Sequence, residues 1–365
     1  MMALRFHWSM SSAGEKLRGA KSRAAQSGIP NLSSYIELCT RAEECGIESL
    51  LTAFGFHRPD PIVLATVLGM MTEKIKFMVA VRSGVFCPTL FVQQVNTVSA
   101  LINGRICLNV VAGHTPVEQR SYGDFLEHDE RYQRTDEFLS VCKAFWRQEE
   151  VNFDGQYYKI ERGKLNTPFV SNDRSYPEIF LGGNSVLAEK LAISHADCLW
   201  RLPDTPGALR ECIRPIVETG TEVGLLVSMI ARPSHAQAVE DAYSMLEGLG
   251  KKPKQTHQEF AKKSDSIAFR STFGLAESTG SDWLSPNLWV GAVPYLGAPA
   301  IALVGSAAEV ASAILEYKEI GVSQFLFMGW PDIEEMTFFA SEVLPIVRAK
   351  EMMAENVAAA AAEKA

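Results

Sequence analysis

The fold is decided by a strand that runs directly into a helix, in the segment Glu178-Ile179-Phe180-Leu181-Gly182-Gly183-Asn184-Ser185. Glu178–Leu181 is predicted as a buried strand because it is short and mostly apolar. The two glycines that follow let the backbone approach a ligand closely. Asn184 or Ser185 would begin the helix, whose free amide groups and dipole favour an anion such as a phosphate. A plain helix cap is the alternative interpretation of these residues.

The same succession of a β-rich apolar run and a helical segment fills most of the chain. It predicts a parallel sheet whose strands are connected by helices. Eight runs are predicted as strands: Leu4–Trp8, Ser49–Ala53, Ile75–Val81, Ile106–Val111, Glu178–Leu181, Asp197–Trp200, Gly224–Ala231 and Gln324–Met328. Eight is the strand number of a TIM barrel, so the predicted fold is α/β, a (β/α)8 TIM barrel.

Helix boundary signals support this count. Ser34 and Glu37 have the spacing of a capping box, and Gly46 ends the apolar stripe that follows them. The same signals return near the end of the chain, where Ser306 precedes Glu309 by three residues and Gly321 follows. Two strand–helix units of the predicted barrel are therefore bounded by the sequence alone.

Residues 1–350 are predicted to form a single barrel domain with two insertions, and residues 351–365 a C-terminal tail. Residues 153–176 contain Asp154-Gly155 between aromatic and charged residues, which predicts a hairpin. Residues 250–299 are rich in Lys, Ser, Gly and Pro, and a segment of that length inside an enzyme commonly serves as a lid over the active site. The alternative is a surface insertion that only packs on the barrel.

The composition is that of a folded enzyme without a nucleic-acid or membrane partner. The chain has 365 residues, 47% of them hydrophobic, and a net charge of -8 with no massed basic residues. Its first residues contain no apolar leader, and no stretch is long enough to span a membrane, so we expect a cytoplasmic protein. The seven cysteines form no C-x-x-C pair and no His or carboxylate cluster has metal-ligand spacing, which predicts no metal site.

Candidate site residues follow or lie within the predicted strands, because barrel enzymes place their chemistry at the carboxyl ends of the strands. Arg82 begins a Gly- and Pro-containing loop, and His114 follows the strand that contains Asn109. A polar Asn109 among apolar residues either serves the core or faces a ligand. His128 and Tyr132 are four residues apart and share one face of a predicted helix start.

Taken together, these segments resemble the bacterial-luciferase-like flavin-dependent monooxygenases, and in particular their alkanesulfonate monooxygenase branch. The resemblance extends over roughly residues 4 to 348. The matching stretches are Val81–Ser83 through Pro88-Thr89, Asn103–Ile106 leading to Asn109–Gly113, Phe125–Tyr132, Glu178–Ser185, Ser285–Trp289, and Leu303–Gly305 into the region of Gly321.

The resemblance implies a two-component monooxygenase that binds reduced FMN (FMNH2) at the carboxyl ends of the strands. A separate flavin reductase would supply the cofactor, O2 would react with it to give a flavin peroxide, and the barrels would pair as a homodimer or homotetramer. The resemblance places Gly183, Asn184 and Ser185 at the FMN phosphate. It places His128 and Tyr132 at the phosphate and the ribityl chain, and Asn109 and Ala80 beside the isoalloxazine ring.

The sequence departs from the alkanesulfonate branch where that branch carries cations. Leu226 and Ser228 replace an Arg-x-His pair, Trp330 replaces a Tyr, and Tyr295-Leu296-Gly297 stands where a lid arginine is expected. Because a sulfonate needs cations around it, we expect another organic substrate. The aromatic and apolar residues expected in the pocket are Trp8, Phe54, Phe56, Leu226 and Trp330, whereas Trp200 is expected in the barrel core. The catalytic candidates are His7, His57, Arg82, His114, Ser228 and Trp330.

Two alternative functions stay open at this stage. A related barrel binds the deazaflavin F420, so the chain could be an F420-dependent dehydrogenase or reductase. The departures from the alkanesulfonate branch are also compatible with a noncatalytic flavin-binding paralogue.

Overall fold

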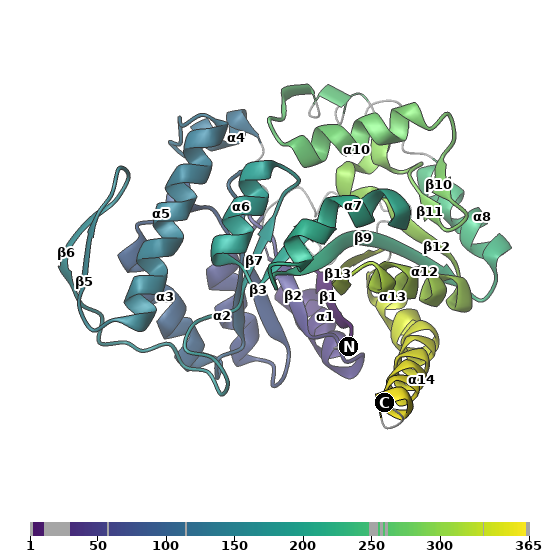
Figure 1. Cartoon of the computed structure of the whole chain (residues 1–365), viewed down its shortest axis with the longest axis horizontal. Coiled ribbons are helices and arrows are strands. Elements are labelled where there is room, and N and C mark those ends of the chain that lie inside the picture. Colours follow the sequence, from purple (N-terminus) through teal and green to yellow (C-terminus); the bar gives the residue numbers. More distant parts are fainter. Residues whose placement is uncertain are drawn as a thin grey trace.

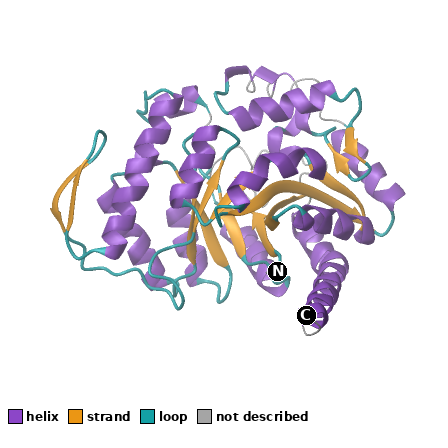
Figure 2. Ribbon diagram, viewed as in Figure 1, coloured by secondary structure: helices purple, strands orange, loops and turns teal. Residues whose placement is uncertain are grey.

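The computed structural model describes residues 3–10, 30–56, 58–113, 115–247, 255, 258–259, 262–330 and 332–362, without the side chains of 358–362. Eight parallel strands close into a barrel in the order β9-β13-β1-β2-β3-β4-β7-β8, with β8 pairing back to β9 (Figures 1 and 2). The (β/α)8 fold is therefore confirmed. The barrel strands are β1 (Arg5–Ser9), β2 (Ser49–Thr52), β3 (Lys76–Val81), β4 (Ile106–Val110), β7 (Ile179–Gly182), β8 (Cys198–Arg201), β9 (Glu222–Arg232) and β13 (Val322–Gly329).

The barrel carries an extension that the strand prediction did not include. The first half of β9 pairs with β8, and its second half, from Ser228 to Arg232, pairs instead with β12 (Ala302–Ser306). The antiparallel strands β11 (Leu288–Trp289) and β10 (Trp283–Ser285) continue that edge. The wall of the barrel thus divides beside β9, at the level of Leu226 and Val227.

Helices cover the outside of the barrel (Figure 2). Their bounds, with the short 3-10 (η2, η3) and π (η4) turns, are α1 Leu32–Glu44, α2 Pro61–Met70, η2 Ser83–Val85, α3 Pro88–Leu101, α4 Pro116–Ser121, α5 His128–Arg147, α6 Val186–His195, α7 Pro206–Val217, α8 His235–Leu246, α10 Ile267–Ser278, α11 Val293–Leu296, η3 Ala298–Ala300, α12 Ala307–Glu319, α13 Asp332–Phe338, η4 Phe339–Val343 and α14 Leu344–Ala362. In the part of the chain that the structure describes, no helix is both long enough and apolar enough to cross a bilayer.

Helix capping agrees with the prediction at one end of the chain and differs at the other. Ser306 and Glu309 form the expected capping box at the start of α12. At α1, however, the cap is Asn31, whose side-chain oxygen accepts the backbone N–H of Ser34. The prediction from Ser34 was wrong because an equally good capping residue lies one turn earlier, and both spacings fit the sequence.

Two segments extend from the barrel. Strands β5 (Val151–Asp154) and β6 (Lys159–Gly163) pair as an antiparallel hairpin that projects beyond α5, at the left of Figure 1. In the second, α10 lies across the top of the same view. Residues 250–254, 256–257 and 260–261 of this second segment lie outside the described residues.

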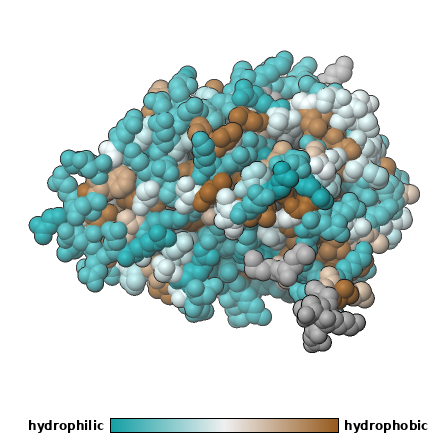
Figure 3. All heavy atoms as spheres, viewed as in Figure 1, coloured by the Kyte–Doolittle hydropathy of each residue, from teal (hydrophilic) through white to brown (hydrophobic). Residues whose placement is uncertain are grey.

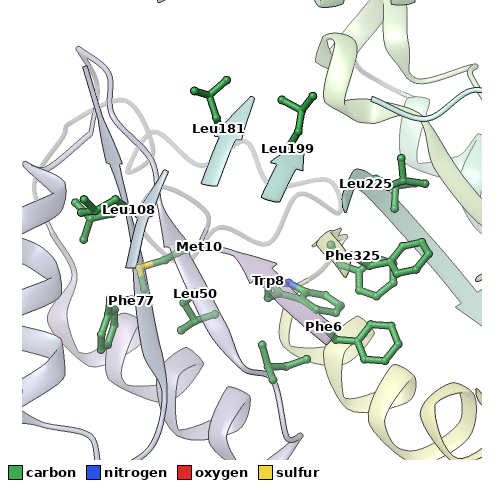
Figure 4. Close-up of a cluster of buried hydrophobic side chains, with 14 of the residues drawn as sticks. Phe6, Trp8, Met10, Leu50, Phe77, Leu108, Leu181, Leu199, Leu225 and Phe325 are labelled. Carbon is green, nitrogen blue, oxygen red and sulfur yellow. The ribbon is translucent and has the colours of Figure 1, made fainter. Parts of the chain in front are cut away.

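The main apolar core lies between the strands and the surrounding helices. Figure 4 shows part of this layer, in which Phe6 stacks on Phe325 with ring centroids 6.0 Å apart. Trp8 is fully buried here, and its indole N–H donates to Asp332 Oδ1 at 3.0 Å. The expectation that Trp8 lies in the pocket was wrong, because alternate residues of β1 face opposite sides of the strand.

Polar residues fill the amino-terminal end of the barrel, which we call the closed end: Arg5, His7, Glu48, Ser49, Glu178, Glu222 and Gln324. Arg5 bonds Glu48 at 2.8 Å and Glu178 at 2.6 Å. Burial raises the pKa of Glu48, but the hydrogen bonds from Arg5 outweigh it and lower that pKa to about 2. Charged groups in a barrel interior are stable only when they are paired in this way.

Candidate active site

A cavity opens at the carboxyl ends of the barrel strands, opposite the closed end. Its space, open mouth included, is about 900 Å³. Its walls come from β2, β4, β7, β8, β9, β13, the start of α5 and the residues before and in α10. The lining residues are Leu51, Asn109, Val111, Ala112, Gly113, His128, Tyr132, Gly182, Gly183, Asn184, Ser185, Trp200, Arg201, Leu202, Leu226, Ser266, Ile267, Ala268, Phe269, Pro299 and Leu326. The position at the strand ends is where barrel enzymes hold their ligands.

One corner of the cavity is made by the end of β7 and the start of α6. Gly183 has a φ of +155°, and a β-carbon there would lie 2.7 Å from Ala188 Cβ and 3.3 Å from the Tyr132 hydroxyl. Only glycine fits this close approach. Ser185 is the N-cap of α6, and its hydroxyl accepts the backbone N–H of Ala188 at 3.1 Å. The start of α6 thus faces the cavity with Asn184 beside it.

The start of α5 forms the opposite side of this corner. A capping box between Glu127 and Glu130 fixes the first turn of α5. The rings of His128 and Tyr132 lie 5.0 Å apart, centroid to centroid, and His128 Nδ1 is 2.7 Å from Asp129 Oδ1. Burial raises the pKa of Tyr132 although its hydroxyl bonds Ser185, so the phenol stays protonated and available as a donor.

The bottom of the cavity combines apolar residues with the two polar side chains Asn109 and Trp200. Asn109 Oδ1 and Trp200 Nε1 are buried and have no hydrogen-bond partner among the described residues. Leu51, Leu226 and Leu326 surround them. Trp200 stacks on Phe180 at 5.3 Å. Trp200, which was expected in the barrel core, therefore also lines the cavity.

Ala80 is the one predicted cofactor contact that does not line the cavity. It is 5% exposed and pairs with Asn109 across β3 and β4. The other predicted contacts, Asn109, His128, Tyr132, Gly183, Asn184 and Ser185, all line it. Segments that are distant in sequence are thus brought to one cavity, and their assignment to FMN remains a prediction.

The roof of the cavity comes from the segment around α10. Ser266 caps this helix, and Ser266–Phe269 line the cavity. Arg131, which is 2% exposed, donates to Ala112 O at 3.0 Å, Leu126 O at 2.9 Å and Asp265 Oδ2 at 2.5 Å. This one guanidinium therefore connects the end of β4, the loop before α5 and the roof.

Sequence reasoning missed Arg201, Leu202, Leu51 and Leu326, whereas Pro299 and the roof residues lie within the predicted lid 250–299. Arg201 ends β8, its side chain is 6% exposed, and it donates to Glu189 Oε1 at 2.7 Å. A cation directly after the predicted strand Asp197–Trp200 was a signal that could have found it. Leu51 and Leu326 carry no such signal, because a leucine in a strand is expected in any core.

His7 is the first catalytic candidate, and it belongs to the closed end. Its Nδ1 lies 2.8 Å from Ser49 Oγ and its Nε2 lies 2.8 Å from Gln324 Oε1. Burial lowers the pKa of His7 to about 4, so the imidazole is neutral near pH 7. It does not line the cavity, and both ring nitrogens are already bonded.

Arg82, Ser228 and Trp330 are also absent from the cavity wall. Arg82 pairs with Glu118 at 2.7 Å, and its guanidinium lies 4.8 Å from the centre of the Phe54 ring. Ser228 Oγ donates to Pro299 O at 3.0 Å, which fixes a residue that does line the cavity. Trp330 packs in a second apolar cluster beside Trp289.

The remaining predictions for the site have different outcomes. His57 and His114 lie outside the described residues. Of the pocket residues expected from the sequence, Leu226 lines the cavity, whereas Phe54 and Phe56 do not. Within the described ranges, no group of three or more His, Cys, Asp or Glu side chains is arranged to hold a metal ion.

Comparison with known proteins agrees with this geometry. A family model described as luciferase-like monooxygenase matches residues 2–324. A riboflavin lyase (RcaE), solved with modified FMN and riboflavin, superposes with a TM-score of 0.77 at 19% identity, over 96% of this chain and 92% of that one. A long-chain alkane monooxygenase (LadA) has the same TM-score, identity and coverage.

A third solved structure carries a different cofactor. An F420-dependent secondary alcohol dehydrogenase superposes with a TM-score of 0.66 at 18% identity, over 95% of this chain and 99% of that one. At such identities a structural likeness shows the fold alone, whereas the family match extends over most of the sequence. The chain belongs to the luciferase-like monooxygenase family, and the expected enzyme class, a flavin-dependent monooxygenase, is confirmed.

Proposed function

We propose that the protein is the oxygenating component of a two-component monooxygenase, which takes reduced FMN from a separate flavin reductase and oxidises an uncharged, apolar organic substrate with O2. One observation carries this proposal. A single cavity joins a polar corner suited to a phosphate to a bottom where Asn109 Oδ1 and Trp200 Nε1 have no hydrogen-bond partner among the described residues.

The polar corner fits the phosphate end of FMN. The first turn of α6 has free backbone amides and the positive end of the helix dipole, which favour a phosphate. Gly183 removes the β-carbon that would fill this corner, and the Tyr132 hydroxyl lies against the same glycine. His128, Asn184 and Ser185 complete the wall. These residues would hold the phosphate and the start of the ribityl chain.

The bottom of the cavity fits the flavin ring. Flavin has acceptors and an N–H donor along one edge, and Asn109 Oδ1 and Trp200 Nε1 offer the complementary acceptor and donor. Both would orient the ring over Leu226 and Leu326. When it is bound, reduced flavin supplies the electrons that activate O2.

The roof is expected to exclude water from the reaction. Ile267, Ala268 and Phe269 present apolar atoms to the cavity. Arg131 holds this segment to β4 and to the loop before α5 through Asp265. The described residues 265–269 of the predicted lid would in this way cover the cavity, with the Arg131–Asp265 ion pair keeping them closed over it.

Among the described residues, the wall left for the substrate carries no charged side chain. Leu226, Pro299 and Phe269 line it, and Ser228 is turned away to bond Pro299 O. A sulfonate would find no cation there to replace its water. A hydrocarbon-like substrate that is not a simple alkanesulfonate is therefore the better fit. Among the catalytic candidates, Ser228 acts as a positioning residue for Pro299.

A flavin reductase partner, a cytoplasmic location and a homodimer or homotetramer remain predictions. Figure 3 shows hydrophobic residues gathered near the middle of the face in view, around α6 and α7. Val186, Ile193 and Val217 are exposed on these helices. Exposed apolar side chains of this kind are typical of subunit contacts.

Turnover with labelled oxygen tests the proposal. Purified protein, reduced FMN from a flavin reductase and a panel of apolar compounds are incubated under 18O2, and products are identified by mass spectrometry. We expect one labelled oxygen atom in the product of at least one compound. Octanesulfonate should release almost no sulfite. Rapid sulfite release would contradict the substrate argument.

The same fold in an F420-dependent alcohol dehydrogenase supports one alternative. In that case the protein would oxidise or reduce its substrate anaerobically with F420 and would consume no O2. A noncatalytic paralogue would bind reduced FMN and turn over nothing. Oxygen uptake in the presence and absence of each cofactor separates these three functions.

A further inference from the structure

Arg201 lies where two cavities of the molecule meet. It lines the cavity described above and also a second cavity between α7 and α10. The two cavities share Asn184, Arg201, Leu202 and Ile267. Arg201 also follows Trp200, whose carbonyl accepts the backbone N–H of Gly183 at 3.3 Å. The guanidinium is thus carried by the strand next to the glycine corner.

The hydrogen bonding of Arg201 is incomplete for so buried a cation. Its side chain is 6% exposed, its Nη1 donates to Glu189 Oε1, and its Nε has no partner in the part of the chain that the structure describes. Arg131, which is 2% exposed, makes three hydrogen bonds. Arg82, which is 8% exposed, also makes a single ion pair and leaves Nη1 without a partner among the described residues, but it does not line the cavity. Buried donors without a partner are rare in folded proteins, so Arg201 is suited to a further acceptor.

Among the described residues, the side-chain partner of Arg201 belongs to the same corner. Glu189 lies in the first turn of α6 and is 29% exposed. A guanidinium has five N–H donors in a rigid fork, so one carboxylate oxygen leaves room for a phosphate oxygen. Asp204, a carboxylate that lines the second cavity, accepts the backbone N–H of Thr205 at 2.7 Å. The anion is therefore expected on the α6 side of Arg201.

We propose that Arg201 is a further binding residue for the cofactor phosphate. Its ion pair with Glu189 offsets part of the positive charge of Arg201 and so weakens its attraction for the phosphate. This inference rests on the proposed function, because it needs FMN in the first cavity. It adds the cation that the glycine corner, with its amide and hydroxyl donors, otherwise lacks among the described residues that line it. The phosphate would accept from Arg201 and from the first turn of α6 together.

Discrimination between FMN and riboflavin tests the proposal, because the two differ only in the phosphate. Anaerobic titrations measure the affinity of the wild type and of Arg201→Gln, Arg201→Lys and Glu189→Gln for reduced FMN and reduced riboflavin. Arg174→Gln is the matched control. Arg174 pairs with Asp197 at the opposite end of β8, and its loss changes the net charge equally.

Arg201→Gln should lower the affinity for reduced FMN by roughly tenfold or more, as expected for the loss of one charge-assisted hydrogen bond. Its affinity for reduced riboflavin should stay within about twofold of the wild-type value. Arg201→Lys should retain part of the wild-type preference for reduced FMN over reduced riboflavin. Glu189→Gln should increase this preference above that of the wild type. An unchanged FMN-to-riboflavin ratio in Arg201→Gln, or a decrease in Glu189→Gln, would overturn the inference. If the wild type itself did not prefer FMN, the proposed function would fail instead.

Discussion

The two ends of the barrel treat their polar groups in opposite ways. At the closed end, Arg5 bonds two carboxylates and His7 has a partner at each ring nitrogen. At the other end, which we call the mouth, Asn109, Asn184, Trp200 and Arg201 each keep a buried polar atom without a partner among the described residues. Satisfied polar groups stabilise a fold, whereas unsatisfied ones cost stability and are retained where a ligand completes them. The comparison therefore supports the proposal that a ligand binds at the mouth.

Removing the central cation of the closed end is expected to have the largest effect on stability. Among the described residues, Arg5→Met would leave the 9% exposed Glu178 without this cation and Glu48 with only Lys76 at 3.4 Å, at a cost of roughly 3 kcal/mol. Urea unfolding measures this loss. Arg174→Met, which breaks the more exposed pair with Asp197, should cost less than about 1 kcal/mol. Equal losses in the two variants would contradict the special role of the closed end.

The closed end should also make the protein sensitive to acid. Because the pKa of His7 is lowered from 6.5 to about 4, the native state binds fewer protons than the unfolded chain between these values. The stabilisation is complete above about pH 6.5 and is lost as the pH falls toward 4, by about 2 kcal/mol between pH 7 and pH 5. His7→Gln should remove this part of the pH dependence. Urea unfolding at pH 7 and pH 5 measures the difference in the free energy of unfolding between the two pH values. The same difference in His7→Gln as in the wild type would refute the assignment.

At the mouth, the loss of a polar group should affect ligand affinity rather than stability. In Asn109→Leu, a buried oxygen without a partner is replaced by an apolar side chain, so the flavin-free protein should keep its stability within about 1 kcal/mol. Its affinity for reduced FMN should fall by roughly tenfold, measured by anaerobic titration. A large loss of stability with unchanged affinity would show that Asn109 serves the core.

The smallest effect is expected at the wall between the two ends. Ser228→Ala removes the hydrogen bond to Pro299 O and should cost about 1 kcal/mol or less. Because Pro299 lines the cavity, the KM for the substrate should change more than the affinity for reduced FMN. Ser228→Thr, which keeps the hydroxyl, is the control. A change in flavin affinity alone would argue against a role for Ser228 in shaping the substrate wall.

The barrel could be predicted from the sequence because its signals are local. Each of the eight barrel strands is an apolar run bounded by turn residues, and each was placed to within about two residues. The strand Ala302–Ser306 was missed because it is not one of the eight barrel strands. It pairs with the second half of β9, beyond the point where β8 ends. Such a division of one strand between β8 and β12 depends on tertiary pairing that no local pattern encodes.

The candidate site was predictable in part for the same reason. Gly183, Asn184 and Ser185 carry a strand–glycine–helix signal, and all three line the cavity. His7 was expected in the site but lies at the closed end, whereas Trp200 was expected in the core but lines the cavity. Alternation along a strand predicts which side a residue faces, but not the height in the barrel at which its side chain lies. Arg201 and Asp265 acquire their roles from contacts with Glu189 and Arg131, which are distant in the sequence.

A crystal structure of the protein soaked with FMN tests the central claim most directly. The account predicts phosphate density beside Gly183 and Ser185, at the start of α6, with the ring edge within hydrogen-bond distance of Asn109 and Trp200. A corner that stays empty at saturating FMN, or a flavin bound at another place on the molecule, would contradict it.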